Sequence, residues 1–213
     1  PLWHTDVTAE LCANPLVRNM ADDEGVQEKI ERAFLLLPPR LNVMVSTAGN
    51  DGSVNVAPYC EFSKLYGNYM VIGMDKERDS LRNLKETGEC VVAVLPVEQA
   101  EKISMSGKPH PYGVSEFEKA GLTPEKSSKV KAPLVKEAFV NYECVLHDTM
   151  GFENSVAVIV KIIDAHFDEK LLKEDENKTR ISSRAAFHVS KGRCFSAFGK
   201  KEVIDTGIDH KNT

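Results

Sequence analysis

Three apolar segments in the first third of the chain are separated by turns. The segments LNVMVST, SVNVAPY and YMVIGM, at residues 41–47, 53–59 and 69–74, are rich in β-branched and aromatic residues. The loop AGNDG, at residues 48–52, separates the first two segments, and an Asp-Gly pair in such a loop is typical of a β-hairpin. The pattern therefore predicts two hairpin strands followed by a third strand.

A helix is predicted directly after the third strand. Arg78, Asp79 and Ser80 precede a run of good helix formers, and Gly88 ends that run. Asp or Ser is a common N-cap residue and Gly a common residue after the last turn, so both helix ends are marked. Backbone N–H groups, a hydroxyl and a guanidinium at such a start also suit a phosphate group. Capping alone explains the same residues, and this feature by itself favours capping.

Four further strands are predicted, at residues 90–97, 139–146, 155–167 and 193–199. The first is a continuous apolar run, which is typical of a strand buried on both faces. The second alternates, with Asn141 and Glu143 opposite its apolar side chains, so we expect a half-buried antiparallel strand. Ser115 is expected to cap the last of three short helices, at residues 28–37, 97–104 and 115–121. Strands dominate, which predicts a mainly β fold, a β-barrel with peripheral helices.

The sequence divides into three segments of different character. Residues 1–34 are mixed and polar and predict an N-terminal extension. Residues 35–200 hold the predicted strands and are long enough for one domain with a full core. Residues 201–213 are polar and predict a C-terminal tail. Cys90 and Cys144 lie inside predicted strands, where we expect them to be small core residues.

Composition narrows the class of protein. The net charge of −5 argues against the basic surface that nucleic-acid binding requires. No apolar run approaches the ~18 residues of a membrane span, so no membrane partner is expected. The five cysteines are widely spaced and form no C-x-x-C pair, which argues against a disulfide framework or a zinc site. A reducing compartment fits this cysteine usage, and we expect a cytoplasmic protein.

Common catalytic motifs are absent from the sequence. It contains no G-x-G-x-x-G after a strand, no Walker A motif, no G-x-S-x-G and no H-E-x-x-H. None of the six histidines has a second ligand at metal-binding spacing, so we assign no metal site and no catalytic acid or base. Residues 55–62, NVAPYCEF, expose backbone groups that can pair with the rim of a flat heterocycle. A strand followed by an irregular loop explains the same residues.

The helix start and the NVAPYCEF segment belong to an ordered set of motifs. In chain order these are P-R at 39–40, D-G at 51–52, N-V-A-P at 55–58, R-D-S-L-R-N at 78–83, E-F-E-K-A-G-L-T-P at 116–124 and E-C at 143–144. Each motif is weak alone, but the ordered set resembles the flavin reductase-like family, the FMN-binding split barrels that include flavoredoxin. The resemblance covers about residues 35–200. It implies a split β-barrel of the Greek-key type.

The resemblance implies FMN as the cofactor and assigns roles to individual residues. Ser80 would hydrogen-bond the FMN phosphate, taking the place of the family's Thr. Arg78 would supply positive charge, with Arg82 or Arg40 as further candidates. Thr47 would be a neighbour of the flavin ring, which would be lined mostly by backbone groups of Asn55, Ala57, Pro58, Tyr59, Cys60, Glu61 and Phe62. For each of these side chains a structural role is the alternative.

The resemblance also implies a homodimer with the flavin at its interface. The loop around His110 and Tyr112 would lie near the flavin or cover it, from the same or the second subunit. Cys60 and Glu61 stand where relatives often have Ser and Phe. We expect Cys60 to be inert, and we expect Glu61, if it points inward, to make the flavin harder to reduce.

Three functions agree with these features. The first is an NAD(P)H-dependent flavin reductase that passes a hydride from NADH or NADPH to FMN. The second is a flavoredoxin-type electron carrier, with tightly bound FMN and a protein redox partner. The third is a flavin-binding or structural protein without turnover. Reductases of the family lack a separate nicotinamide motif, so its absence here does not separate the three.

Overall fold

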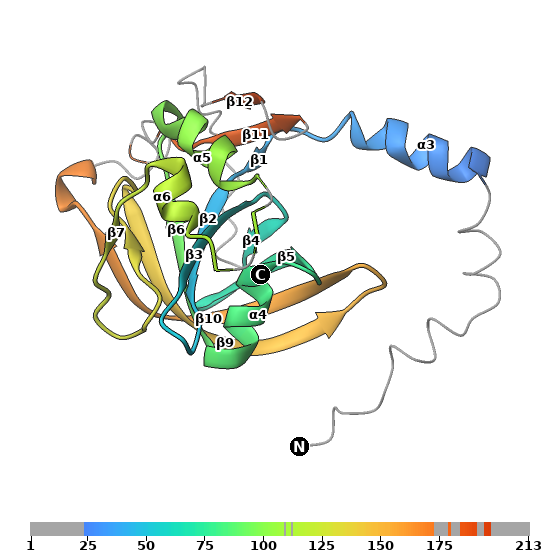
Figure 1. Ribbon diagram of the computed structural model, residues 1–213. Coiled ribbons are helices and arrows are strands. Elements are labelled where there is room, and N and C mark those ends of the chain that lie inside the picture. Colours follow the sequence, from blue (N-terminus) through green and yellow to red (C-terminus); the bar gives the residue numbers. More distant parts are fainter. Residues whose placement is uncertain are drawn as a thin grey trace, which may run out of the picture. The chain divides into compact units, whose positions relative to one another are not determined.

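The computed structural model describes residues 24–108, 110–111, 113–172, 179, 184–190 and 194–196. Contacts between residues divide the chain into two units, residues 1–38 and residues 39–213. Helix α3, Glu24–Phe34, belongs to the first unit. It has an acidic residue in its first turn and Arg32 in its last turn, which complements the helix dipole. All the described strands belong to the second unit (Figure 1).

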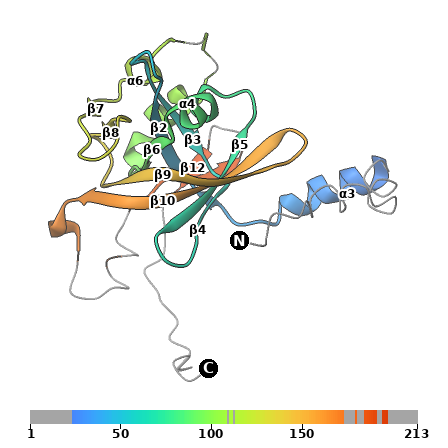
Figure 2. The same ribbon diagram turned by 90° about the horizontal axis from the view of Figure 1, so that it is seen from below.

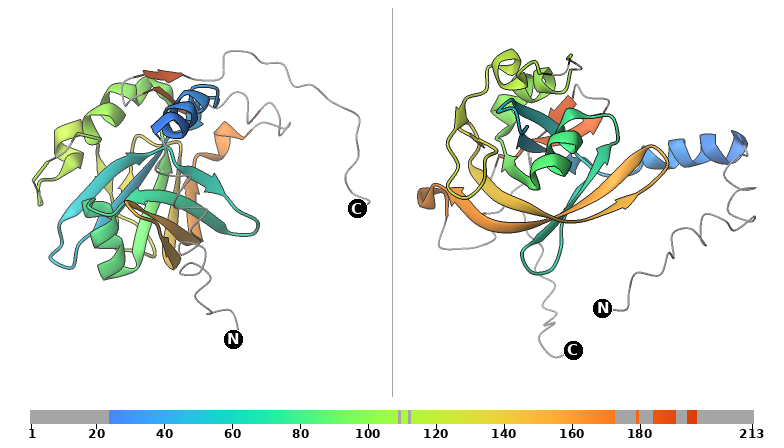
Figure 3. Two further views of the ribbon diagram at one scale, coloured as in Figure 1. Left: turned by 90° about the vertical axis from the view of Figure 1, so that its right-hand side faces the viewer. Right: turned by 60° about the horizontal axis from the view of Figure 1, so that its bottom comes forward.

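A seven-stranded antiparallel sheet forms the body of the second unit. Its strands lie in the order β3-β2-β6-β9-β10-β5-β4. Their bounds are β2 Val43–Ala48, β3 Val54–Tyr59, β4 Phe62–Lys64, β5 Tyr69–Asp75, β6 Glu89–Val94, β9 Val140–Gly151 and β10 Ser155–Phe167. The sheet curls into a half-barrel (Figure 3), and its strands β9 and β10 form a long hairpin (Figure 2). The predicted mainly β, split-barrel fold is therefore confirmed.

Two small sheets complete the described β-structure. One has the order β1-β11-β12, with strands Arg40–Leu41, Phe187–Ser190 and Cys194–Ser196. The other pairs β7, Pro124–Glu125, with β8, Leu134–Val135. Strand β11 was not predicted from the sequence, because it is short and its partner β1 lies far from it along the sequence. The predicted last strand is confirmed at β12, whereas residues 193 and 197–199 lie outside the described residues.

Helix α4, Asp79–Thr87, follows β5 as predicted. Its N-cap is Arg78, in an extended conformation, rather than Asp79 or Ser80, so the predicted cap residue was wrong. Both predicted candidates instead lie in the first turn. Gly88 ends the helix in the left-handed region, with φ of 71°, as predicted.

The remaining helices are short. They are η1 Val97–Gln99, α5 Ala100–Ser106, α6 Glu116–Ala120 and η2 Glu169–Leu171. Ser115 occupies the N-cap position of α6 but makes no capping hydrogen bond, so the predicted capping box does not form. Helices α5 and α6 pack against each other and against β3, while α4 packs on β2 and β3 (Figure 1). Among the described residues, no helix combines the length and apolar character that crossing a bilayer requires.

Both faces of the central strands are buried. Along β2, Val43 and Val45 belong to the core inside the curled sheet, which also contains Leu84 of α4. Met44 points the other way, into a second core that includes Ile103 of α5 and Phe117 of α6. Strand β6 also alternates, with Cys90, Val92 and Val94 in the first core, Ala93 in the second and Val91 in a small cluster with Ala132 and Leu134. This arrangement explains the continuous apolar run in the sequence of β6.

The polar face of β9 is buried, contrary to the prediction of a half-buried strand. Asn141 is 6% exposed and Glu143 is 0% exposed, because the segment from 127 to 135 covers them. The N–H of Val135 donates to Asn141 Oδ1 at 2.9 Å. Glu143 accepts three hydrogen bonds from backbone N–H groups of residues 128–130. The two polar side chains therefore anchor this covering segment instead of facing water.

Candidate functional site

A cavity of about 500 Å³ lies where strands β3 and β5 meet the start of α4 and the end of α5. Its size falls in the range of pockets that hold small organic ligands. One wall is formed by Asn55, Ala57, Pro58, Tyr59, Glu61 and Gly73. The rest of the lining comes from Asp75, Glu77, Arg78, Asp79, Ser80, Ser106, Gly107, Lys108, His110 and Glu116.

The cavity brings together most of the residues that the sequence singled out. From the predicted set, the lining includes Asn55, Ala57, Pro58, Tyr59, Glu61, Arg78 and Ser80. Residue 110 from the predicted covering loop also lines it, whereas residue 112 lies outside the described residues. The NVAPYCEF segment and the helix start, which are separate in sequence, thus form one site.

Five predicted residues lie outside the cavity lining. Thr47 is buried and accepts a hydrogen bond from Asn83 Nδ2 at 3.2 Å. Phe62 of β4 packs against the core. Arg82 lies 3.7 Å from the Asp79 carboxylate. The other two are Arg40 and Cys60, and for all five a contact with a cofactor stays a prediction.

Arg40 and Cys60 both contact Glu61, a residue of the cavity wall. Arg40 Nη1 lies 2.6 Å from Glu61 Oε1, and the Cys60 thiol donates to Glu61 Oε2 at 3.2 Å. Burial and the adjacent carboxylate raise the pKa of the Cys60 thiol to about 11. The thiol is therefore protonated at neutral pH, which agrees with an inert Cys60. The Arg40 guanidinium offsets the negative charge of Glu61.

The start of α4 faces the cavity with Arg78, Asp79 and Ser80. The first N–H groups of a helix have no partner within the helix, and the helix dipole favours an anion there. Ser80 is 1% exposed, and its hydroxyl donates to Asn55 Oδ1 at 3.0 Å. Its single proton is thereby used inside the protein. The arrangement leaves the backbone N–H groups and the Arg78 guanidinium as the donors for an anionic ligand.

Two buried polar atoms in the cavity wall lack a hydrogen-bond partner among the described residues. They are the Tyr59 hydroxyl and His110 Nε2. Burial raises the pKa of Tyr59 above its ordinary value, so the hydroxyl is protonated and available as a donor. A buried polar group without a partner is costly, and such groups in a cavity wall fit a polar ligand.

Two glycines allow the backbone to approach the neighbouring walls closely. A Cβ atom at Gly73 would lie 2.8 Å from the Cβ of Glu61, and the Gly73 N–H donates to the Glu61 carbonyl at 2.7 Å. A Cβ atom at Gly107 would lie 3.1 Å from Pro58 Cγ. Each position thus has room for glycine and little more. The missing side chains at these two glycines therefore allow the lining segments to pack closely against each other.

Eight residues that line the cavity were assigned no cofactor contact from the sequence. They are Gly73, Asp75, Glu77, Asp79, Ser106, Gly107, Lys108 and Glu116. Glu116 was part of a recognised motif, which was the only signal for it. Gly107 and Lys108 lie in a loop-rich stretch, and nothing local indicates that this stretch folds against Pro58.

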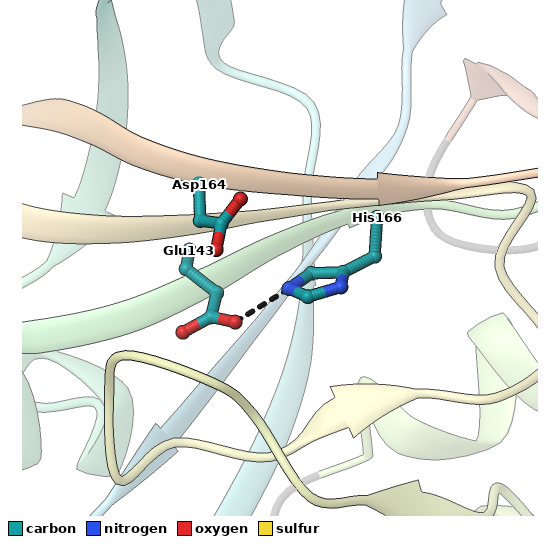
Figure 4. Close-up of side chains that lie close together, drawn as sticks. All are labelled: Glu143, Asp164 and His166. Atoms are coloured by element: carbon teal, nitrogen blue, oxygen red, sulfur yellow. Dashed lines mark hydrogen bonds and ion pairs between the residues drawn. The ribbon is translucent and has the colours of Figure 1, made fainter.

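A second group of titratable side chains lies on β9 and β10 (Figure 4). Glu143 Oε1 lies 2.5 Å from His166 Nε2, and Asp164 is the third member. Burial alone would raise the pKa of Glu143, but the backbone N–H groups of Ser128 and Lys129 and the His166 ring lower it below its ordinary value. Both Glu143 oxygens already accept hydrogen bonds. The group therefore acts as an anchor for the segment after residue 127.

The chain belongs to the flavin reductase-like family. The family model described as "Flavin reductase like domain" matches residues 39–182. This match covers most of the second unit and the whole described cavity wall. The family and the split-barrel fold implied by the ordered motifs are confirmed.

Individual relatives agree with this membership. An uncharacterized protein of Aquifex aeolicus (strain VF5) is 36% identical over 148 residues, which are 64% of this chain and 76% of the relative. The crystal structure of nitrilotriacetate monooxygenase component B from Bacillus cereus has a TM-score of 0.75 at 22% identity, over 86% of this chain and 96% of that one. Flavoredoxin of Desulfovibrio vulgaris (Miyazaki F) has a TM-score of 0.69 at 20% identity, over 80% and 92%. At these identities the solved structures establish the shared fold.

Proposed function

We propose that the cavity binds FMN and that the protein is an NAD(P)H-dependent flavin reductase, which passes a hydride from NADH or NADPH to the flavin. One observation carries the proposal. In a chain of the flavin reductase like family, residues 55–61 and the start of α4 converge on a single cavity. These are the two segments that the motif resemblance assigns to the flavin ring and to its phosphate.

Two parts of the cavity lining would bind two parts of FMN, the phosphate and the ring. At the start of α4, the Arg78 guanidinium and the first helical N–H groups would hold the phosphate. Along the other wall, the backbone from Ala57 to Glu61 would pair with the rim of the ring, and Gly73 and Gly107 would keep the walls close to it. FMN, when bound, supplies the hydride-accepting chemistry.

Tyr59 and His110 bring polar groups that the protein itself does not satisfy among its described residues. A protonated Tyr59 hydroxyl would donate to the ligand without titrating near neutral pH. No proton transfer by a side chain is needed for hydride transfer to a flavin. The proposal therefore assigns binding and orientation to the protein.

An anaerobic visible spectrum tests the proposal. The purified protein is mixed with FMN, and the flavin absorbance is followed after NADH and then NADPH are added. Bleaching at a catalytic rate by one nucleotide is the expected result and identifies the donor. A bound flavin spectrum that dithionite bleaches, while neither nucleotide does, would replace the reductase with the flavoredoxin-type carrier. Failure to bind FMN would reject both.

A further inference from the structure

Three buried polar side chains form one hydrogen-bond chain in the cavity wall. Asn55 Nδ2 donates to Glu116 Oε2 at 2.8 Å, and the Ser80 hydroxyl donates to Asn55 Oδ1 at 3.0 Å. They come from β3, α4 and α6, and their exposed fractions are 7% for Asn55, 1% for Ser80 and 6% for Glu116. All three line the cavity.

The direction of this chain depends on the protonation of Glu116. An ionised carboxylate only accepts hydrogen bonds, and an amide has a donor at one end and an acceptor at the other. With Glu116 ionised, Asn55 must point its NH2 toward Glu116 and its oxygen toward Ser80. Ser80 then gives its only proton to Asn55 and presents only oxygen lone pairs to the cavity. Lone pairs repel a phosphate group.

A neutral Glu116 permits the opposite direction. The carboxyl O–H donates to Asn55 Oδ1, the amide turns by half a rotation, and its NH2 donates to Ser80 Oγ. The Ser80 hydroxyl proton is then free to point into the cavity. The heavy atoms keep their positions, because the oxygen and nitrogen of an amide are nearly the same size. The two directions therefore differ by one proton, which comes from solvent.

We propose that Glu116 is the positioning residue that decides whether the cavity accepts a phosphorylated flavin, because its neutral form turns the Ser80 hydroxyl toward the phosphate. This inference rests on the proposed function. It predicts that FMN binding takes up one proton, while riboflavin, which has no phosphate, binds without that uptake. The Tyr59 hydroxyl, which belongs to a residue that is 8% exposed, lies beside the Ser80 side chain in the same cavity wall.

The surroundings of Glu116 make its neutral form accessible at a higher pH than for a solvated carboxyl. Burial raises the pKa of Glu116 and the Asp79 carboxylate raises it further, whereas a hydrogen bond from its own backbone N–H and the Arg78 guanidinium oppose the rise. A phosphate at the start of α4 would add negative charge and favour proton uptake again. The other charged or titratable groups that share the cavity wall with Glu116 are Tyr59, Glu61, Asp75, Glu77, Lys108 and His110.

Binding measurements across pH test the proposal. Dissociation constants for FMN and riboflavin are measured by calorimetry from about pH 5.5 to about pH 8.5 in two buffers of different ionisation enthalpy. The parent is expected to lose FMN affinity by about tenfold per pH unit above the pKa of Glu116, with riboflavin affinity flat. Glu116→Gln is neutral at every pH and is expected to lose this dependence, apart from that of the phosphate itself near pH 6.

Riboflavin affinity of the Glu116→Gln variant reports whether its cavity is intact. Equal FMN pH profiles in the parent and in this variant would overturn the proposal while leaving flavin binding in place. A parent that binds neither flavin would reject the proposed function and this inference together. Ser80→Ala provides a second comparison if Glu116→Gln does not fold. It removes the end of the chain, so its FMN binding is expected to take up no proton beyond that of the phosphate itself, and uptake equal to the parent's would overturn the proposal.

Discussion

Arg78 presents the guanidinium that borders the cavity at the start of α4. Replacing it in Arg78→Ala removes a charge-assisted hydrogen bond to the phosphate, which is worth about 1.5–3 kcal/mol. We therefore expect FMN to bind about 10–100-fold more weakly, while riboflavin affinity stays the same. Fluorescence titration of both flavins measures the effect.

Arg82→Ala is the matched control for this substitution. Arg82 lies on the same helix, near Asp79, but does not line the cavity. Its loss is expected to change FMN affinity by less than about threefold, since exposed ion pairs contribute about 0–1 kcal/mol. A larger loss of FMN affinity in Arg82→Ala than in Arg78→Ala would indicate that Arg82, and not Arg78, contacts the phosphate.

Local sequence patterns predicted one part of the cavity lining and did not predict the rest. The stretch from Asn55 to Glu61 and the helix start were accessible from sequence, because turn, strand and capping preferences are local. Glu116 and Lys108 reach the cavity only through the packing of α5 and α6 on β3. The use of the Ser80 proton by Asn55 was also hidden, since it depends on a contact between two separate elements.

The segment after residue 127 is held to β9 by Glu143, whose buried carboxylate accepts from three backbone N–H groups. Glu143→Gln replaces an acceptor oxygen by an NH2 group facing those donors. We expect the free energy of unfolding to fall by about 3–5 kcal/mol at neutral pH, as for other broken buried charge networks. Urea unfolding followed by circular dichroism measures it.

The same substitution has a defined pH dependence. The folded-state pKa of Glu143 is lowered, so its stabilisation is present above the unfolded pKa of about 4.3 and is lost as pH falls through the folded value. The stability gap between parent and Glu143→Gln is therefore expected to narrow below about pH 4. Glu125→Gln is the control, because Glu125 is exposed and lies 3.8 Å from Lys136 in a surface pair. A gap that is constant with pH would contradict this role of Glu143.

Elements with strong local signals were predicted, and elements set by distant contacts were not. The hairpin of β2 and β3, strand β10 and the end of α4 at Gly88 agree with the structure because periodicity and turn residues define them. The polar positions of β9 suggested a solvated face, since sequence alone does not show the segment that covers Asn141 and Glu143.

At the scale of the whole molecule, the family resemblance leads us to expect a homodimer with flavin at its interface. The turn between β4 and β5 exposes apolar groups, with Leu65 37% and Tyr66 100% exposed. A shallow hollow beside it is lined by Lys64, Leu65, Tyr66, Tyr69, His147 and Ile159. Covering these groups with a second copy would remove apolar surface from water, which favours association.

Sedimentation equilibrium tests this expectation. The parent is expected to have twice the chain mass of 23.6 kDa, and Tyr66→Lys is expected to dissociate at higher protein concentrations than the parent. Because Tyr66 is fully exposed within one chain, the substitution is expected to leave the free energy of unfolding of the isolated monomer unchanged. Single-chain mass for the parent at every concentration, with FMN present, would contradict the homodimer. An unchanged dimer in Tyr66→Lys would place the interface on another surface of the chain.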